Sequence, residues 1–241
     1  PRRFSRSFVL SGRGRFSVRP RFSRGRPLTK TLCAPASQTH LRRIRASPNM
    51  KVLVACEFSG VVRDAFIASG HEAVSCDLLP TQSPGPHHQG DVRDLLHLDW
   101  DLMIAHPPCT HLAASGARWF RDKQAEQAAA LAFVRLLWEA SIPRIALENP
   151  VGILSTHLRK PNQIIHPWQF GEPITKATCL WLKGLRSLRP TQIVERGKHV
   201  QYGSKRIPLW YANLKSSDRA QKRSVTSVGI AAAMADQWGS Q

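Results

Sequence analysis

Short apolar runs alternate with stretches of helical periodicity along the chain from residue 50 onward. The runs are rich in Val, Ile, Leu and Ala, as expected of strands that are buried on both faces of a sheet. They occupy residues 51–56, 72–76, 101–105 and 143–147. Apolar residues recur at helical spacing over 61–69, before Gly70, and over 122–140, where Asp122 is the expected N-cap. This alternation predicts an α/β domain with a largely parallel sheet and helices on both faces.

The pattern is looser in the second half of the chain. Residues 162–170 and 178–182 are predicted to form strands, and 227–238 a final helix. Because no second run of strands and helices follows, residues 50–241 are expected to form a single domain.

Residues that can do chemistry follow two of the predicted strands. The prolines at 107–108 cannot donate ladder hydrogen bonds, so the strand at 101–105 is expected to end before them, with Cys109 just beyond. Glu148 follows the next buried strand in the same way. Ligands of open α/β sheets bind beyond the carboxyl ends of the strands. The sequence therefore predicts that Cys109 and Glu148 face one cleft, and the alternative for Cys109 is a small buried core residue.

The first half of the predicted sheet has the order of a nucleotide-type cofactor half-site. A strand is followed by the turn 57–60, a helix, and a second strand that ends in Asp77. Gly60 allows close approach of the backbone to a ligand, and Asp77 can accept hydrogen bonds from ribose hydroxyls. The alternative for Asp77 is an ordinary turn residue.

The formal net charge of +19 is unevenly distributed along the chain. Residues 1–49 contain 13 Lys and Arg, no acidic residue and no strand or helix periodicity, so we expect them to be disordered. Three origins are open for them: a leader foreign to a protein that starts at Met50, a basic arm for phosphate contacts, and an organellar transit peptide. The first is favoured because the folded pattern begins at Met50. The basic, aromatic-containing stretch 186–228 suits nucleic acid, although loops are often basic for solubility alone.

The five cysteines show no paired C-x-x-C spacing, which indicates a reduced compartment rather than a disulfide framework. No apolar run in the sequence is long enough to span a bilayer. We therefore expect a cytoplasmic protein.

Several motifs resemble those of the cytosine-5 DNA methyltransferases, and especially of the short methylase-like proteins of phages. The specific matches are Pro107-Pro108-Cys109, which resembles the Pro-Pro-Cys catalytic loop, and Glu148-Asn149-Pro150, which resembles Glu-Asn-Val. Weaker matches are Phe58-Ser59-Gly60 with the Phe-x-Gly cofactor turn, Asp77 with the ribose-binding acid, Asp91 with the acid that contacts adenine, and Gly229-Ile230-Ala231 with the last motif. Val62 and Arg63 stand where the family has further glycines, and Thr110 where it has glutamine.

The resemblance implies a Rossmann-like domain that transfers a methyl group from S-adenosylmethionine to carbon 5 of cytosine in DNA. It makes Cys109 the nucleophile and Glu148 the group that stabilises the transition state. The cofactor residues that it implies are Phe58, Ser59, Gly60, Asp77, Asp91 and Pro107. The substrate residues that it implies are Pro108, Asn149, Lys176, Lys205 and Arg206, the last three in place of a Gln-x-Arg-x-Arg motif that this sequence lacks. Neither a metal nor a membrane is implied, and the expected location is a bacterial or phage-infected cytoplasm.

Three other functions are open on the same residues. A methyltransferase for exocyclic amino groups would share the fold, but its loop has a polar residue before the prolines and an aromatic after them, which His106 and Cys109 fit poorly. A catalytically inert nucleic-acid-binding module is suggested by the replaced glycines. A zinc site made of His106, Cys109 and His111 lacks a fourth ligand at standard spacing.

Overall fold

The computed structural model describes residues 49–215 and 219–241. The expected disordered leader at 1–49 lies outside the described residues except for Asn49, as does Cys33.

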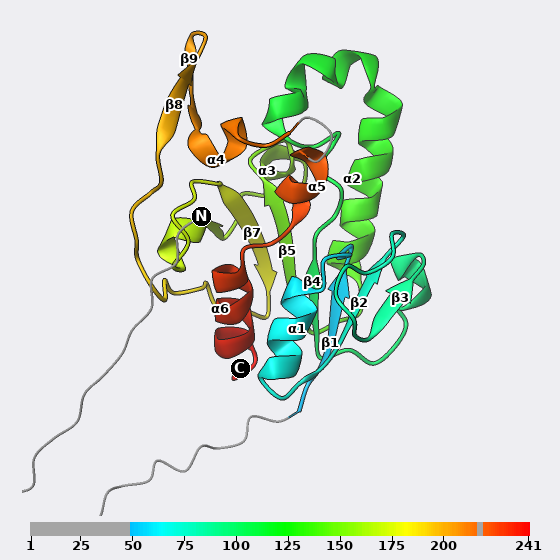
Figure 1. The fold of residues 1–241 in the computed structure, drawn as a ribbon. Coiled ribbons are helices and arrows are strands. Elements are labelled where there is room, and N and C mark those ends of the chain that lie inside the picture. The colour runs from blue at the N-terminus through cyan, green and yellow to red at the C-terminus, as the bar shows by residue number, and fades with distance from the viewer. Residues whose placement is uncertain (1–48, 216–218) are drawn as a thin grey trace, which may run out of the picture. The chain divides into compact units, whose positions relative to one another are not determined.

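A seven-stranded sheet organises this part of the chain (Figure 1). Its order is β3-β2-β1-β4-β5-β7-β6. The first four pairs are parallel, and β7 runs antiparallel to both β5 and β6. The strands are β1 Lys51–Ala55, β2 Glu72–Asp77, β3 His87–Gln89, β4 Leu102–Ala105, β5 Arg144–Pro150, β6 Gln163–Ile165 and β7 Thr178–Lys183. The order reverses between β1 and β4, which is where open α/β sheets bind their ligands.

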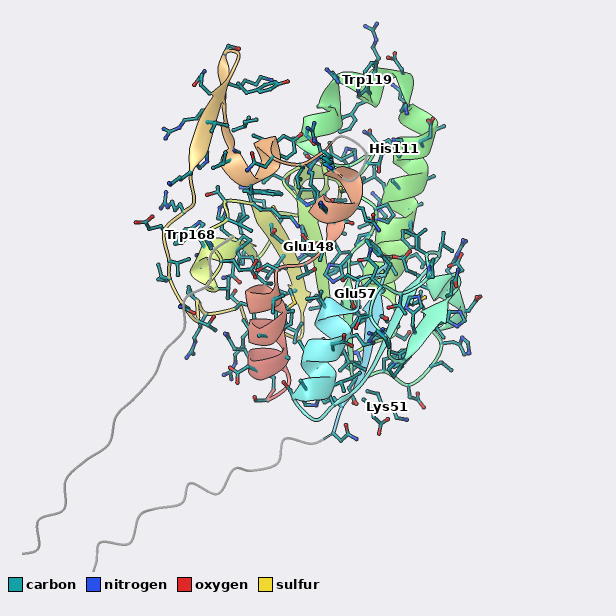
Figure 2. All side chains as sticks on the ribbon, in the orientation of Figure 1. Lys51, Glu57, His111, Trp119, Glu148 and Trp168 are labelled. Atoms are coloured by element: carbon teal, nitrogen blue, oxygen red, sulfur yellow. The ribbon has the colours of Figure 1, made fainter. Side chains whose placement is uncertain are left out.

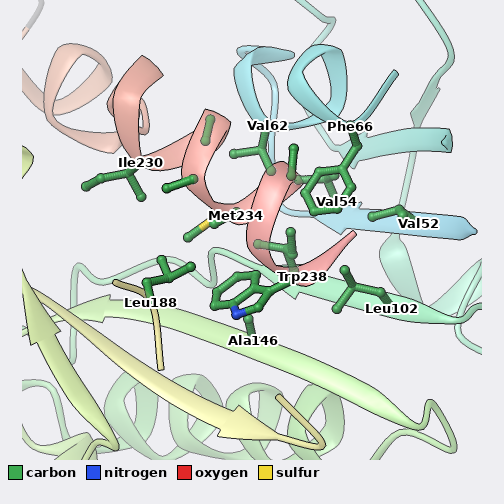
Figure 3. Packing of buried hydrophobic residues seen from close by; sticks show 14 of the residues in the cluster. Val52, Val54, Val62, Phe66, Leu102, Ala146, Leu188, Ile230, Met234 and Trp238 are labelled. Atoms are coloured by element: carbon green, nitrogen blue, oxygen red, sulfur yellow. The ribbon is translucent and has the colours of Figure 1, made fainter. Parts of the chain in front are cut away.

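Helices cover both faces of the sheet, as the alternating pattern predicted. Helices α1 (Val61–Ala68) and α6 (Val228–Trp238) pack on one face, against alternate residues of β1 and β4 such as Val54 and Leu102 (Figure 3). Helix α2 (Gln124–Glu139) packs on the other face through Leu137. Each central strand is therefore buried on both sides, and the predicted α/β, Rossmann-like fold with a largely parallel sheet is confirmed.

Shorter elements connect the layers and extend beyond the sheet. They are the 3-10 helices η1 Val92–Asp94, η2 Ala114–Asp122 and η3 Pro167–Gln169, and the helices α3 Leu154–His157, α4 Leu209–Ala212 and α5 Arg219–Ser224. Strands β8 (His199–Tyr202) and β9 (Lys205–Pro208) form a separate antiparallel hairpin that leads directly into α4. We call this element the basic hairpin.

Two expectations about element ends are wrong. The predicted strand at 162–170 stops at Ile165, because Pro167 begins η3 and the Gln169 side chain accepts the backbone N–H of His166. Asp122 does not cap the long helix. It is the last residue of η2, and α2 begins after Lys123, whose side chain makes no capping hydrogen bond.

The strand predicted at 143–147 also continues further than expected. It runs to Pro150 because β7 pairs with it, and Glu148 and Asn149 lie opposite Leu180 and Cys179. Glu148 is therefore held within the sheet and does not follow it in a loop.

Arg63 ties helix α1 to the loop after β2. It is completely buried, donates hydrogen bonds to Ser75 Oγ and the Ser83 carbonyl, and forms an ion pair with Asp64 at 2.8 Å. A Cβ added at Gly60 would lie 2.5 Å from the guanidinium, and Gly60 has a φ of +77°. The arginine thus fills the space beside the turn, and it leaves room there for glycine only.

We expect Arg63→Met to lower the free energy of unfolding by about 2–4 kcal/mol, because buried acceptors lose their donor. Urea denaturation measures this change. Arg93→Met is the control, since the Arg93 guanidinium pairs with Asp91 at an exposed position, and it should leave the denaturation midpoint unchanged. A wild-type midpoint for Arg63→Met would show that the arginine does not hold the loop.

Candidate functional site

The carboxyl ends of β1, β4 and β5 bring the candidate residues together. Ala55 pairs with Ala105 and Ala105 with Leu147, so the residues that follow them meet at one edge of the sheet. Figure 2 shows Glu57 and Glu148 toward this edge and Lys51, which starts β1, at the opposite one. The β4–β5 pairing confirms that the strands predicted before Cys109 and Glu148 are neighbours, but Glu148 itself stays within β5.

His106 and Glu148 form a buried pair at the centre of this edge. The His106 Nδ1 atom lies 3.1 Å from Glu148 Oε2, and the two side chains are 7% and 15% exposed. Burial alone would raise the pKa of Glu148, but the hydrogen bond and charge of His106 and the charge of Lys176 hold it below its ordinary value. The second nitrogen of His106, Nε2, is buried and has no hydrogen-bond partner among the described residues. The pair therefore presents a negatively charged carboxylate at the end of the strand.

Asn149 fixes the segment that carries the prolines. Its side-chain amide donates a 2.8 Å hydrogen bond to the backbone carbonyl of Pro107. Both residues are buried, whereas Pro108 is exposed. The bond joins β5 to the residues after β4 and so links the Cys109 segment to the strand that carries Glu148.

Cys109 lies half-buried at the start of the next turn, where its carbonyl accepts the N–H groups of Leu112 and Ala113. Burial, and then the negative charge of Glu148, raise the pKa of its thiol. The positive charges of Arg223 and Lys176 act in the opposite direction. The thiol is therefore within electrostatic range of Glu148 and of two cations from α5 and from the loop before β7.

The candidate cofactor turn is built around Glu57, a residue that the sequence-based reasoning passed over. Its carboxylate accepts hydrogen bonds from the Ser59 hydroxyl at 3.0 Å and from the N–H groups of Val62 and Arg63 at 2.7 and 3.2 Å. Phe58 and Ser59 are buried beside it, and Gly60 precedes the first residue of α1. The amino end of α1 is thus satisfied by a carboxylate of the chain itself.

Asp77 and Asp91 lie at the carboxyl ends of β2 and β3. The Asp77 carboxylate accepts the N–H of Leu79 at 2.9 Å. Asp91 caps η1 and pairs with Arg93 at 2.5 Å, and this hydrogen bond lowers the pKa of Asp91. Burial and then the charge of Asp77, with a smaller effect of Asp91, raise the pKa of Cys76 to about 11, which places both acids near one thiol. The two acids proposed to contact a cofactor therefore lie on neighbouring strand ends.

A pocket of about 260 Å³ opens beside Glu148. Lys176, predicted as a substrate residue, lines it, whereas Cys109 and Pro108 do not. Its lining consists of Glu148, Pro167, Glu172, Ile174, Lys176, Thr178, Trp210, Lys222, Val225, Thr226, Ser227, Val228 and Ile230. Trp210 had no sequence signal beyond its place in a basic, aromatic-containing stretch.

The three basic residues predicted to contact substrate do not lie together. Lys176 belongs to the pocket, while Lys205 and Arg206 lie on the basic hairpin, in strand β9. The structure therefore separates a lysine beside the candidate site from two cations on an exposed arm.

The described residues contain no group of three or more His, Cys, Asp and Glu side chains arranged to hold a metal ion, so His106, Cys109 and His111 do not form the zinc site considered above. Over residues 49–215 and 219–241, no helix is long and apolar enough to cross a membrane.

Comparison with solved structures gives distant similarities. The chain is similar to a mutant of Spodoptera frugiperda DNMT2, with 14% identity and a TM-score of 0.35 over 70% of this chain and 60% of that one. It is also similar to WbdD crystallised with the kinase inhibitor LY294002, with 14% identity and a TM-score of 0.31 over 73% of this chain and 48% of that one. The chain thus spans less than two thirds of either protein. No family model matches the sequence, and no curated protein matches it.

Proposed function

We propose that this protein transfers a methyl group from S-adenosylmethionine to carbon 5 of cytosine in DNA, through a covalent adduct with Cys109. The observation that carries the proposal is the pairing of β4 with β5, which puts the Cys109 turn next to the strand that holds Glu148, with Asn149 hydrogen-bonded to the Pro107 carbonyl. A thiol and a carboxylate in this relation can act on one heteroaromatic ring.

The cofactor turn supports S-adenosylmethionine over a dinucleotide. The free N–H groups at the amino end of a helix are the usual binding site for a pyrophosphate. In this chain the Glu57 carboxylate already occupies those of Val62 and Arg63. A second anion there would be repelled, whereas S-adenosylmethionine carries no phosphate. The turn 58–60, Asp77 and Asp91 would hold it, and when bound it supplies an electrophilic methyl group.

The residues of this chain would act on cytosine in a defined order. The Cys109 thiolate forms a bond from Sγ to ring carbon 6, and the displaced π electrons make carbon 5 nucleophilic. Glu148 accepts hydrogen bonds from the exocyclic amino group and from ring nitrogen 3, which takes up a proton from solvent during the addition. After carbon 5 has been methylated, a base removes its proton, the ring double bond re-forms as the bond to Sγ breaks, and ring nitrogen 3 returns its proton to solvent. Because these ring atoms are inaccessible in a duplex, the base must be flipped out.

We expect Asp77→Ala to weaken S-adenosylmethionine binding roughly 10-fold, because a charge-assisted hydrogen bond to a ribose hydroxyl is lost. Isothermal titration calorimetry measures the affinity. Asp99→Ala is the matched control, since Asp99 is an exposed acid in the loop before β4, at the opposite edge of the sheet. Equal affinity of wild type and Asp77→Ala would place the cofactor elsewhere.

The proposal as a whole is tested by incubating the protein with duplex DNA and S-adenosylmethionine, followed by mass spectrometry of the nucleosides. The expected product is 5-methylcytosine. N4-methylcytosine or N6-methyladenine would instead indicate transfer to an exocyclic amino group. If the cofactor binds and no methylated nucleoside forms, the inert nucleic-acid-binding alternative replaces the proposal.

A further inference from the structure

Helix α4 carries two neighbouring aromatic side chains, and one of them lies in the wall of the candidate pocket. Trp210 lines the pocket next to Glu148. Tyr211 carries the guanidinium groups of Arg219 and Arg223 over its ring, at 5.1 and 5.4 Å, and the two aromatic rings meet edge to face at 6.0 Å. The helix follows β9 directly and is joined to the base of the basic hairpin, because the N–H of Leu209 donates to the Lys198 carbonyl. Helix α4 thus connects the exposed cations of the basic hairpin to the pocket.

Hydrogen bonds hold the walls of the pocket in place. The Trp210 indole N–H donates to the Thr175 carbonyl at 3.1 Å, which fixes the plane of the ring. Across the pocket, the Lys176 ammonium donates to the Val225 carbonyl at 3.2 Å. Glu172 accepts from the N–H of Gly229 at 3.0 Å. These hydrogen bonds connect the side chains of the pocket wall to the backbone around it.

The size and lining of the pocket suit a single planar base. Its volume of about 260 Å³ is slightly below the roughly 300 Å³ at which small-molecule sites begin. Trp210 provides an aromatic face, Ile174 and Ile230 provide apolar sides, and Glu148 provides a carboxylate that can accept from an amino group. Bases taken out of a helix are held in this way, by stacking on aromatic side chains and hydrogen bonds to the base edge.

The basic hairpin suits the strand to which such a base is attached. The basic hairpin and the residues that flank it, 196–215, contain five Lys and Arg and no Asp or Glu. Two of the five, Lys205 and Arg206, are exposed on β9 itself, which ends directly before α4. Phosphate contacts by such cations supply affinity that does not depend on the base.

We propose that this pocket binds an unstacked pyrimidine of a nucleic acid strand and that Trp210 is the wall on which the base stacks. The inference rests on the proposed function and deepens it, because it names an aromatic residue that holds the target base next to Glu148, while Cys109 would reach that base from outside the pocket lining. Stacking of one base on an aromatic side chain contributes about 1–3 kcal/mol when measured by alanine substitution.

The test compares binding of a fluorescent deoxycytidine dodecamer with that of an abasic dodecamer of the same length, without a methyl donor. The wild type should bind the deoxycytidine strand more tightly. Trp210→Ala should bind it about 5- to 150-fold more weakly and the abasic strand unchanged. Trp210→Phe should keep most of the preference. Trp119→Ala is the control, because Trp119 is 53% exposed on η2 and outside the pocket.

Thermal melting of each variant accompanies the binding measurement. If Trp210→Ala melts early, Trp210→Leu takes its place, since leucine fills the wall without an aromatic face. A ribocytidine dodecamer identifies whether DNA or RNA supplies the base, and tighter binding of either strand fits the proposal. The proposal is overturned if Trp210→Ala or its substitute keeps the wild-type preference, if Trp119→Ala loses it equally, or if the wild type shows none. A protein that shows the preference and transfers no methyl group would disprove the proposed reaction alone.

Discussion

Cys109→Ser should abolish methyl transfer, with a loss on the order of 10³-fold or more, while the protein still folds and binds S-adenosylmethionine. A serine hydroxyl is far less ionised and less nucleophilic than a thiol, so the bond to ring carbon 6 does not form. The thiol is half-buried, so a serine hydroxyl in its place is not enclosed in the core. Transfer of a labelled methyl group to DNA measures the rate, and thermal melting measures the stability.

The alternative, in which Cys109 is a small buried core residue, predicts reduced stability and normal activity for Cys109→Ser. A core cysteine replaced by serine would bury a hydroxyl, lower the melting temperature and leave chemistry intact. Cys179→Ser provides that comparison, because Cys179 is buried on β7 opposite Asn149. We expect Cys179→Ser to lose stability and retain activity at permissive temperature. Near-normal turnover of Cys109→Ser would eliminate the covalent mechanism.

The rate should also depend on pH in a direction set by the thiol. Burial and the charge of Glu148 raise the pKa of Cys109, so only a small fraction is thiolate near neutral pH. If the thiolate is the attacking species, single-turnover methyl transfer rises with pH through the neutral and mildly alkaline range. A rate that is flat over this range would mean that thiol ionisation does not limit the reaction.

The sheet and its central residues could be predicted because the signal is local. Runs such as 52–55 and 102–105 contain apolar residues at every position, and only a strand covered on both faces buries them all. Prolines after the second run mark its end, so Cys109 could be placed beyond it. The same local signal predicts the strand before Glu148 but ends it at residue 147, whereas pairing with β7 extends it to Pro150.

The remaining parts of the site depend on contacts between segments far apart in the sequence. The His106–Glu148 pair spans 42 residues, and the ladder that keeps Glu148 within the sheet comes from β7, inserted antiparallel beside β5. Nothing in the pattern of residues 178–183 indicates that orientation. The place of Trp210 in the site could not be predicted either, because the four-residue helix α4 is too short to show helical periodicity in the sequence. Lys176 and Lys205 were equal candidates in the sequence, and only the fold separates them.

Acid stability should depend on the His106–Glu148 pair. The pKa of Glu148 is lower in the folded protein than in the unfolded chain, so its contribution to stability is present above the ordinary carboxyl pKa. That contribution is lost as the pH falls through the lower, folded value. We expect Glu148→Gln to lose less stability than the wild type when the pH is lowered through this range.

Glu148→Gln is expected to lower methyl transfer by on the order of 10²–10³-fold and, at the same time, to increase the reactivity of Cys109 toward iodoacetamide. The rate falls because an amide cannot stabilise the proton that the ring nitrogen gains. The reactivity rises because the carboxylate charge raises the pKa of the thiol, and a neutral side chain removes that effect while Arg223 and Lys176 remain. Peptide mass spectrometry after timed alkylation at constant pH measures Cys109 alone.

The two changes of opposite sign distinguish this role from a structural one. A variant that merely loosened the sheet would expose the other described thiols together with Cys109, so Cys56, Cys76 and Cys179 are followed in the same experiment. Glu172→Gln is the matched control, because Glu172 is a second carboxylate of the same pocket, bonded to Ser227 and Gly229, and does not contribute to the pKa of Cys109. It should leave Cys109 alkylation unchanged. If Glu148→Gln slows alkylation of Cys109, or leaves methyl transfer near the wild-type rate, the two side chains do not act on one ring.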